Sequence, residues 1–220
     1  THQSDRNINN KLFSKKPECI SEWYGTNVTT NAKNLYAVPL GIGNDYLNIY
    51  KNQKNIIDDL IGSANNKNDA AFMNFRINTN TNERLKAFFA LYEEEWVNFR
   101  FIKQEPREYL LDLNNSKFTI CPWGNGFDTH RLWESLYLGS IPVTKFHKAY
   151  EQFQDLPIIF IKNWKKVDLD FLNMAANKLP NPNLNKLTID YWELKIKNMK
   201  LNNEEYYQHN LNEMEKVKIV

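Results

Sequence analysis

The sequence is poor in cysteine and has no long hydrophobic run. Two of its 220 residues are cysteines, Cys19 and Cys121, which is too few for a disulfide framework or a cysteine-based zinc motif. A reducing compartment, by default the cytoplasm, is therefore expected. Eighteen consecutive apolar residues occur nowhere, so no transmembrane segment is predicted. No signal peptide is visible, although a chain that starts at Thr1 rather than Met leaves room for an upstream segment.

An excess of charge of one sign is absent as well. The 28 basic and 26 acidic side chains leave a net charge of +2. The aromatic residues fall mostly at the spacing of core positions, with no basic stripe beside them. The sequence therefore predicts no nucleic-acid partner. With 42% hydrophobic and 14% aromatic residues, the composition is that of a globular protein with a sizeable core.

Two common nucleotide-binding motifs are missing. The sequence contains neither Gly-x-Gly-x-x-Gly nor Gly-Lys followed by Ser or Thr. These strings would mark a dinucleotide-binding turn and a P-loop, respectively. Neither hydride transfer with a nicotinamide cofactor nor P-loop chemistry is therefore expected.

Strand and helix patterns alternate along most of the chain. Residues 70–77 form a continuous apolar run, typical of a parallel strand buried on both faces, and residues 83–92 follow with a helical pattern. Helices are also predicted over residues 145–154 and over residues 168–179, with Met174 facing inward. The alternation predicts an α/β fold with a Rossmann-like, doubly wound, mostly parallel sheet.

The most informative stretch is residues 117–144, KFTICPWGNGFDTHRLWESLYLGSIPVT. It predicts a strand, a turn over residues 122–128 that we call the glycine loop, a helix and a second strand. Asp128 or Thr129 can cap the helix, and Gly139 suits its left-handed end. A glycine loop that opens a helix presents backbone N–H groups and the positive end of the helix dipole. This arrangement binds anions such as phosphate.

Side chains around this loop extend the prediction to a nucleotide. Gly124, Asn125 and Gly126 form its centre, and a ligand can approach the backbone closely where glycine has no Cβ. Arg131 lies in the first helical turn, where a guanidinium can clamp a phosphate. Glu134 lies one turn later, on the face opposite the apolar residues, and can accept hydrogen bonds from ribose hydroxyls. Together these residues predict a nucleotide-diphosphate ligand.

A second strand, loop and helix supplies further polar residues. Asn78, Thr79 and Asn80 follow the apolar strand, and ligands of open α/β sheets gather beyond the carboxyl ends of the strands. These three can donate to a phosphate or a sugar hydroxyl, and Arg84 can neutralise charge. Alternatively, Arg84 is a solvated helix residue.

The string GNGFDTHRLWESLYLGSIPV resembles the donor-binding signature of exostosin-like glycosyltransferases, a group of the GT-B type. That signature has a glycine loop, then Asp, His or Thr, Arg, a Glu one helical turn later, and a Gly-x-Ile-Pro-Val ending. A looser similarity extends over residues 1–172. The resemblance implies the C-terminal, donor-binding half of a GT-B enzyme, with Arg131 on the donor pyrophosphate and Glu134 on the ribose. Asp128 then belongs to the donor site.

The resemblance also implies a reaction. A sugar passes from a nucleotide-diphosphate sugar to a glycan or another hydroxyl acceptor, with inversion, without a metal and without a further cofactor. A general base then has to activate the acceptor hydroxyl. Asp128 can instead cap the helix, and His130 can instead bind a donor phosphate or sugar. The candidates for the base are His2, Asp5, Asp128 and His130, the first two because THQSD is similar to a His-x-Ser-Asp segment of such transferases.

We expect three parts in the chain. Residues 1–68 form a partial acceptor-side segment or an extension, residues 69–180 the nucleotide-sugar-binding domain, and residues 181–220 a C-terminal helix that packs back on the chain. A complete GT-B enzyme has two Rossmann-like halves, and 220 residues are few for both. The alternative is therefore a non-catalytic module, derived from a donor domain, that binds a nucleotide sugar or a glycan. A base in the N-terminal part would distinguish the two.

Overall fold

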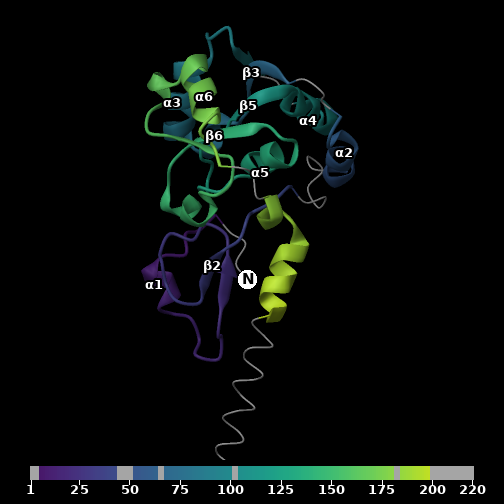
Figure 1. Ribbon diagram of the computed structural model, residues 1–220. Helices are drawn as coiled ribbons and strands as arrows, with labels where there is room; N and C mark the ends of the chain where they lie inside the picture. Colours follow the sequence, from purple (N-terminus) through teal and green to yellow (C-terminus); the bar gives the residue numbers. More distant parts are fainter. Residues whose placement is uncertain (1–4, 44–51, 64–66, 101–103, 181–183, 199–220) are drawn as a thin grey trace, which may run out of the picture. The chain divides into compact units, whose positions relative to one another are not determined.

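The chain forms two compact units, residues 1–182 and residues 183–220. Within the second unit, η5 (Leu184–Leu187) precedes a helix over residues 189–198. The part of the chain that the computed structural model (Figure 1) describes consists of residues 5–43, 52–63, 67–100, 104–180 and 184–198.

A five-stranded parallel sheet lies at the centre of the first unit. Its strands stand in the order β4-β3-β5-β6-β7, and every neighbouring pair is parallel. The chain therefore runs outward from β3 to β4, returns to β5 on the other side of β3, and continues in that direction. The strands are β3 (Asn68–Met73), β4 (Val97–Phe99), β5 (Ser116–Ile120), β6 (Ile141–Lys145) and β7 (Ile159–Ile161).

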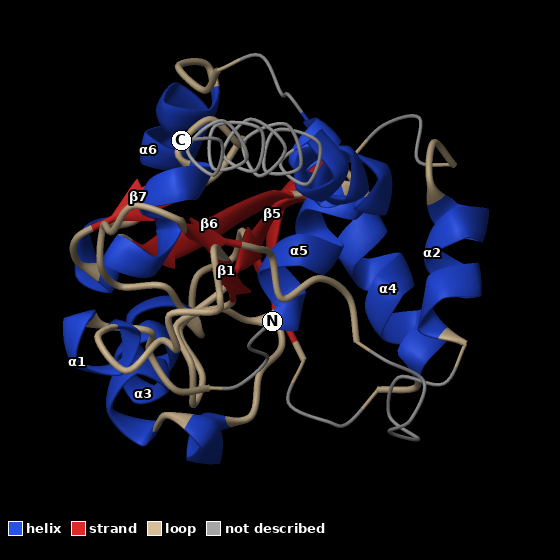
Figure 2. Cartoon of the chain, turned by 90° about the horizontal axis from the view of Figure 1, so that it is seen from below, coloured by secondary structure: helices blue, strands red, loops and turns tan. Residues whose placement is uncertain are grey.

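Helices cover both faces of this sheet (Figure 2). Successive residues of a strand point to opposite faces. Ala71 and Met73 belong to one core cluster, together with residues of α3 and α6, whereas Phe72 belongs to a second cluster with residues of α2 and α4. The predicted Rossmann-like, doubly wound fold is confirmed. The helices are α2 (Gln53–Leu60), α3 (Thr81–Leu91), α4 (Pro106–Asn115), α5 (His130–Tyr137) and α6 (Leu169–Ala176).

Local sequence signals explain where several helices begin and end. The side chain of Asn80 accepts a hydrogen bond from Glu83 N at the start of α3, and that of Asp168 accepts one from Phe171 N at the start of α6. Pro106 occupies the first turn of α4, where its missing N–H costs nothing. α5 ends at Tyr137 and is followed by Leu138 as its C-cap and by Gly139, which has a φ of +68° that a residue with a Cβ rarely adopts.

Two local predictions are wrong. The predicted helix over residues 145–154 is divided, because β6 continues to Lys145 and only η3 (Lys148–Phe153) is helical, with 3-10 geometry. His147 caps η3 by accepting a hydrogen bond from Ala149 N. Met174 is 61% exposed, since Leu172 occupies the inward position of α6 and is fully buried.

The N-terminal residues form a smaller layer that contacts the loops of the parallel sheet. It consists of α1 (Asn10–Phe13) and the parallel pair β1 (Trp23–Gly25) and β2 (Leu35–Ala37). Ala37 N donates to Gln152 Oε1 of η3 at 3.0 Å. That this N-terminal layer belongs to the acceptor side remains a prediction. Among the described residues, no helix has the length and hydrophobicity needed to cross a bilayer.

A largely buried ion pair joins α3 to the end of β6. Lys145 Nζ lies 2.8 Å from Glu83 Oε2, and Trp164 Nε1 donates to Glu83 Oε1 at 2.6 Å. The side chain of Glu83 is only 8% exposed. Glu83 therefore joins α3 to the end of β6 and to η4 (Trp164–Lys166).

The Glu83→Ala variant is expected to lose about 3 kcal/mol of unfolding free energy, because it leaves a partly buried ammonium and a buried indole N–H without their acceptor. Urea denaturation measures this loss. Glu94→Ala is the matched control, since Glu94 accepts from Trp96 Nε1 on the surface, and its loss should stay within about 0.5 kcal/mol. Equal losses in both variants would contradict the structural role of Glu83.

Candidate functional site

The candidate site lies where the direction of strand addition reverses, between β3 and β5. In doubly wound sheets, ligands bind beyond the carboxyl ends of the strands at this switch point. The loop after β3 and the glycine loop after β5 meet there: Asn80 Nδ2 donates to Gly124 O at 3.0 Å, and Arg84 Nε donates to Trp123 O at 3.0 Å. Residues predicted from two separate segments are thus brought together.

Arg84 is the central side chain of this junction. It is 6% exposed, so it is not a solvated helix residue. Besides its bond to Trp123 O, its Nη1 donates to Arg76 O at 2.6 Å. Burial, and then the nearby positive charge of Arg131, lower the pKa of Arg84 to about 9. The structure therefore holds two guanidinium groups near each other at the carboxyl end of the sheet, where an anion would stabilise both.

The two loop glycines make room for the protein's own side chains. A Cβ on Gly124 would lie 2.9 Å from Arg84 Nη2. A Cβ on Gly126 would lie 3.0 Å from Asn27 Nδ2 and 3.2 Å from Asp5 Oδ1. The expectation that a ligand uses this space is therefore corrected, because Arg84, Asn27 and Asp5 already approach the loop there. A ligand that reaches the loop has to contact these side chains as well.

Asp128 is an interior anchor for the end of the glycine loop. Its Oδ2 accepts from Leu40 N at 2.9 Å, and its Oδ1 accepts from Trp133 Nε1 at 2.6 Å. Burial raises the pKa of Asp128 to about 7, although the hydrogen bonds from Leu40 N, Trp133 Nε1 and Thr129 N act in the opposite direction. The helix cap by position is Thr129, whose side chain makes no capping bond. Asp128 thus joins the N-terminal layer to α5.

Besides Asp128, two further candidates for the base, His130 and Asp5, lie among the described residues near the N-terminal layer. The imidazole of His130 donates from Nδ1 to Gly41 O, at 2.7 Å. A carbonyl oxygen only accepts, so this bond places the proton on Nδ1 and leaves Nε2 as the acceptor of the neutral ring. Asp5 lies beside Gly126, as described above. His2, the fourth candidate, lies outside the described residues.

Glu134 is buried rather than exposed. It was expected on the outer face of α5, but α2 and α4 cover that face, and its exposure is 2%. Gln53 Nε2 donates to its Oε1 at 2.5 Å and Tyr109 OH to its Oε2 at 2.8 Å. Burial, and then the charge of Glu134, raise the pKa of Tyr109 well above its ordinary value. The carboxylate thus joins three helices, and its contact with a ribose remains a prediction.

Of the remaining predicted donor ligands, two bond to nearby backbone atoms and two are exposed to solvent. Thr79 Oγ1 donates to Arg76 O at 3.1 Å, and Asn80 caps α3. Asn78 and Asn125 are exposed. Of the ligands predicted after β3, Asn80 and Arg84 bond to the glycine loop directly, as described above.

Three contributors to the site were not predicted: Asn27, Gln53 and Tyr109. Asn27 is 4% exposed, has a φ of +53°, and accepts a hydrogen bond from Asp128 N at 2.9 Å through its Oδ1. Asparagine is one of the few residues with a Cβ that adopts this conformation. No short-range pattern identifies a residue whose partner lies 101 positions later in the chain.

The described side chains do not form a metal site. Within the described ranges, no three His, Cys, Asp or Glu side chains converge as metal ligands would. The sequence contains an Asp-x-Asp string at Asp168 and Asp170, but Asp168 caps α6. The absence of a metal from the reaction remains a prediction.

The ionisation of Asp128 is expected to appear as a pH-dependent signal. Because its pKa in the folded state, about 7, exceeds the ordinary value of 3.8, the folded protein binds a proton between these values that the unfolded chain releases. This contribution to stability is fully present below about pH 4 and is lost as the pH rises through about 7, by up to about 1.4 kcal/mol per pH unit. The indole N–H resonance of Trp133 should titrate with a midpoint near pH 7.

Asp128→Asn should abolish this titration and the corresponding fall in stability, whereas Asp170→Asn, on an exposed position of α6, should leave both unchanged. Urea denaturation at pH 5 and pH 8 measures the stability change. A Trp133 resonance that is constant between these pH values in the unmodified protein would contradict the assignment.

Comparison with known proteins assigns the chain to a family. A family model described as the RXYLT1 C-terminal domain matches residues 48–180, which is more than half of the 220 residues. The matched range contains the whole parallel sheet, the glycine loop and α5. No curated protein matched the chain. The chain therefore belongs to the RXYLT1 C-terminal domain family, an exostosin-family domain related to glycosyltransferases.

Proposed function

We propose that the chain is the donor-binding part of a GT-B glycosyltransferase. In this proposal it transfers a sugar from a nucleotide-diphosphate sugar to a hydroxyl of a glycan or another acceptor, with inversion of the anomeric carbon. Family membership supports a glycosyltransferase-related role. The observation that carries the proposal is the pair of arginines, Arg84 and Arg131, at the switch point of the sheet.

The arginine pair favours a ligand with more than one negative charge. Arg84 is held in place by the carbonyls of Trp123 and Arg76, so it cannot turn away from Arg131 without breaking these bonds. Like charges held close together in a buried environment repel strongly. A diphosphate between them would relieve this repulsion. Arg131 lies in the first turn of α5, directly after the glycine loop, and is the candidate for direct contact with the pyrophosphate.

The start of α5 supplies further donors for the same anion. The positive end of its dipole lies beside the glycine loop. The hydroxyl of Thr129 is buried and has no hydrogen-bond partner within the described residues, and a phosphate oxygen would accept a bond from it. These groups would stabilise the charge that develops on the leaving diphosphate. The reaction then needs neither a metal nor a cofactor besides the nucleotide sugar.

The ribose is assigned to Glu134. Each oxygen of a carboxylate can accept more than one hydrogen bond, so the bonds from Gln53 and Tyr109 do not use its full capacity. Because the side chain is 2% exposed, the approach of a ribose requires the Gln53 side chain to move. The negative charge of Glu134 would also hold Arg131 near the diphosphate through electrostatic attraction.

The general base is assigned to His130. The bond from its Nδ1 to Gly41 O fixes the ring and presents Nε2 as the proton acceptor. Gly41 has a φ of +74°, so its carbonyl orientation depends on a glycine. We favour His130 over Asp5 because a neutral imidazole adds no negative charge beside the departing diphosphate.

Arg131→Ala is expected to weaken binding of nucleoside diphosphates by about 10- to 100-fold, because a charge-assisted hydrogen bond contributes about 1.5–3 kcal/mol. Isothermal titration calorimetry with UDP, GDP, CDP and inorganic pyrophosphate measures the effect. Arg107→Ala is the control, since Arg107 is an exposed arginine paired with exposed Asp59. Failure of the unmodified chain to bind any of the four ligands, or equal weakening in both variants, would contradict the proposal.

His130→Gln is expected to lower kcat by about 10²- to 10⁴-fold with little change in donor affinity, because it removes the proton acceptor but keeps a side chain of similar size. The assay is nucleoside diphosphate release from a panel of nucleotide sugars. Asp5→Asn serves as the comparison and should retain most of the rate. The reverse ranking of the two variants would assign the base to Asp5.

A further inference from the structure

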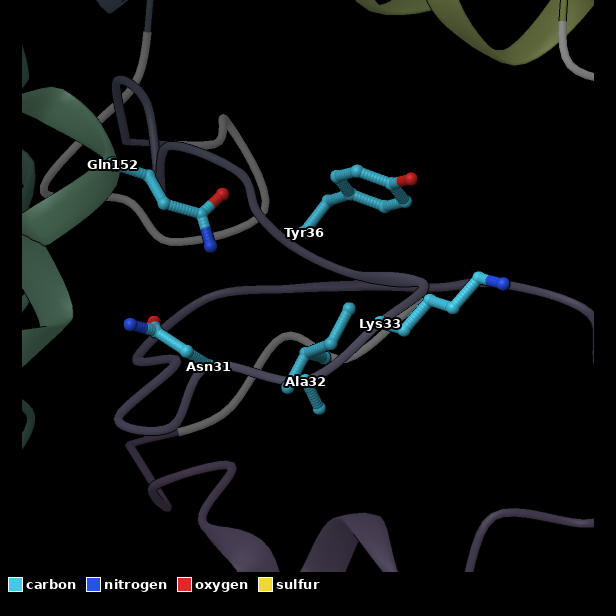
Figure 3. A pocket seen from close by; sticks show the side chains of 6 residues that line it. Asn31, Ala32, Lys33, Tyr36 and Gln152 are labelled. Atoms are coloured by element: carbon cyan, nitrogen blue, oxygen red, sulfur yellow. The ribbon is translucent and has the colours of Figure 1, made fainter.

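A shallow cavity of about 430 Å³, widely open to solvent, lies beside η3, and none of the residues assigned to the donor lines it. In Figure 3, Gln152 enters it from η3, and the labelled residues opposite come from the N-terminal layer. The residues that line the cavity are Asn31, Ala32, Lys33, Leu35, Tyr36 and Gln152.

The lining combines the groups that a sugar ring needs. The amides of Asn31 and Gln152 each offer both donors and an acceptor, as do the hydroxyls of a sugar. Tyr36 presents an aromatic ring, and a pyranose has C–H groups on its faces that can pack on such a surface. The six lining residues include no carboxylate, imidazole or thiol, although Asn31 Nδ2 donates to the exposed carboxylate of Glu151 at 3.4 Å, and their one cation, Lys33, is exposed. The cavity therefore suits a neutral saccharide better than a metal ion or a phosphate.

The polar groups of the cavity are held in place before a ligand binds. Gln152 Oε1 accepts from Ala37 N at 3.0 Å, which fixes the amide against β2. The ring of Tyr36 stacks on Tyr24 with centroids 5.0 Å apart and an interplanar angle of 23°. Such preorganisation lowers the entropy that a ligand has to overcome.

One short element connects this cavity to the glycine loop. At the start of η3, His147 stacks on Phe127 with centroids 3.4 Å apart and an interplanar angle of 10°. Tyr150 OH then donates to Phe127 O. Gln152 follows two residues later, on the wall of the cavity. The same short element, η3, thus contacts both the glycine loop and the cavity.

We propose that this cavity is a subsite for a neutral pyranose ring of the glycan acceptor. The proposal rests on the proposed function, because an acceptor needs a transferase. It adds a place for a sugar of the acceptor that does not itself react. The hydroxyl that receives the new sugar lies nearer to His130 and the glycine loop.

The test uses the full chain without any nucleotide. Methyl β-D-glucopyranoside, methyl β-D-galactopyranoside and methyl α-D-mannopyranoside are titrated to roughly 50 mM, since single sugars are expected to bind with millimolar Kd. The side-chain amide resonances of Asn31 and Gln152 report binding by NMR. At least one pyranoside should shift both resonances saturably.

Two tryptophan variants separate this site from a surface effect. Ala32→Trp should fill the cavity and abolish the saturable shifts of Gln152, whereas Lys165→Trp, on an exposed position of η4, should bind as the unmodified chain does. Absence of saturable shifts with all three pyranosides would overturn the proposal, and so would unchanged binding in Ala32→Trp.

The outcome is distinguishable from a failure of the proposed function. Pyranoside binding in a chain that binds no nucleoside diphosphate would retain the saccharide subsite and remove the transferase. Nucleoside diphosphate binding in a chain that binds no pyranoside would retain the transferase and remove the subsite.

Discussion

The site depends on the hydrogen bonds that the buried guanidinium of Arg84 donates to two loops. From α3 it holds the loop after β3 through Arg76 O and the glycine loop through Trp123 O. Its Nη2 occupies the space that a Cβ on Gly124 would need, at 2.9 Å. Glycine at position 124 is thus required by a protein contact. A cation fixed in this way cannot adjust its position, so its charge is available to any anion that enters beside it.

A second constraint joins the N-terminal layer to the parallel sheet. Asp128 accepts from Leu40 N and Trp133 Nε1, and Asn27 accepts from Asp128 N. These bonds place the end of the glycine loop against residues that precede the parallel sheet by many positions. The N-terminal layer therefore helps to hold the glycine loop in position.

The fold could be predicted from the sequence because strands that are buried on both faces consist of continuous apolar runs. Residues 71–73 are entirely buried, and a continuous apolar run of that kind predicts a parallel strand. The end of α5 was also predicted correctly, because Gly139 supplies the positive φ that follows the helix. Glu134 was placed on the wrong side because helical periodicity in α5 says nothing about α2 and α4, which cover its polar face. Asn27 escaped prediction since its role depends on a distant backbone N–H.

Hydrogen–deuterium exchange with and without nucleoside diphosphates tests the central claim most directly, because it locates the ligand on the chain. With at least one of UDP, GDP and CDP, the account predicts slower exchange in two separated segments, residues 76–84 and residues 122–134. These segments contain Arg84 and Arg131 together with the glycine loop. Slower exchange confined to other parts of the chain, or no change with any of the three, would contradict the claim that the arginine pair holds a diphosphate.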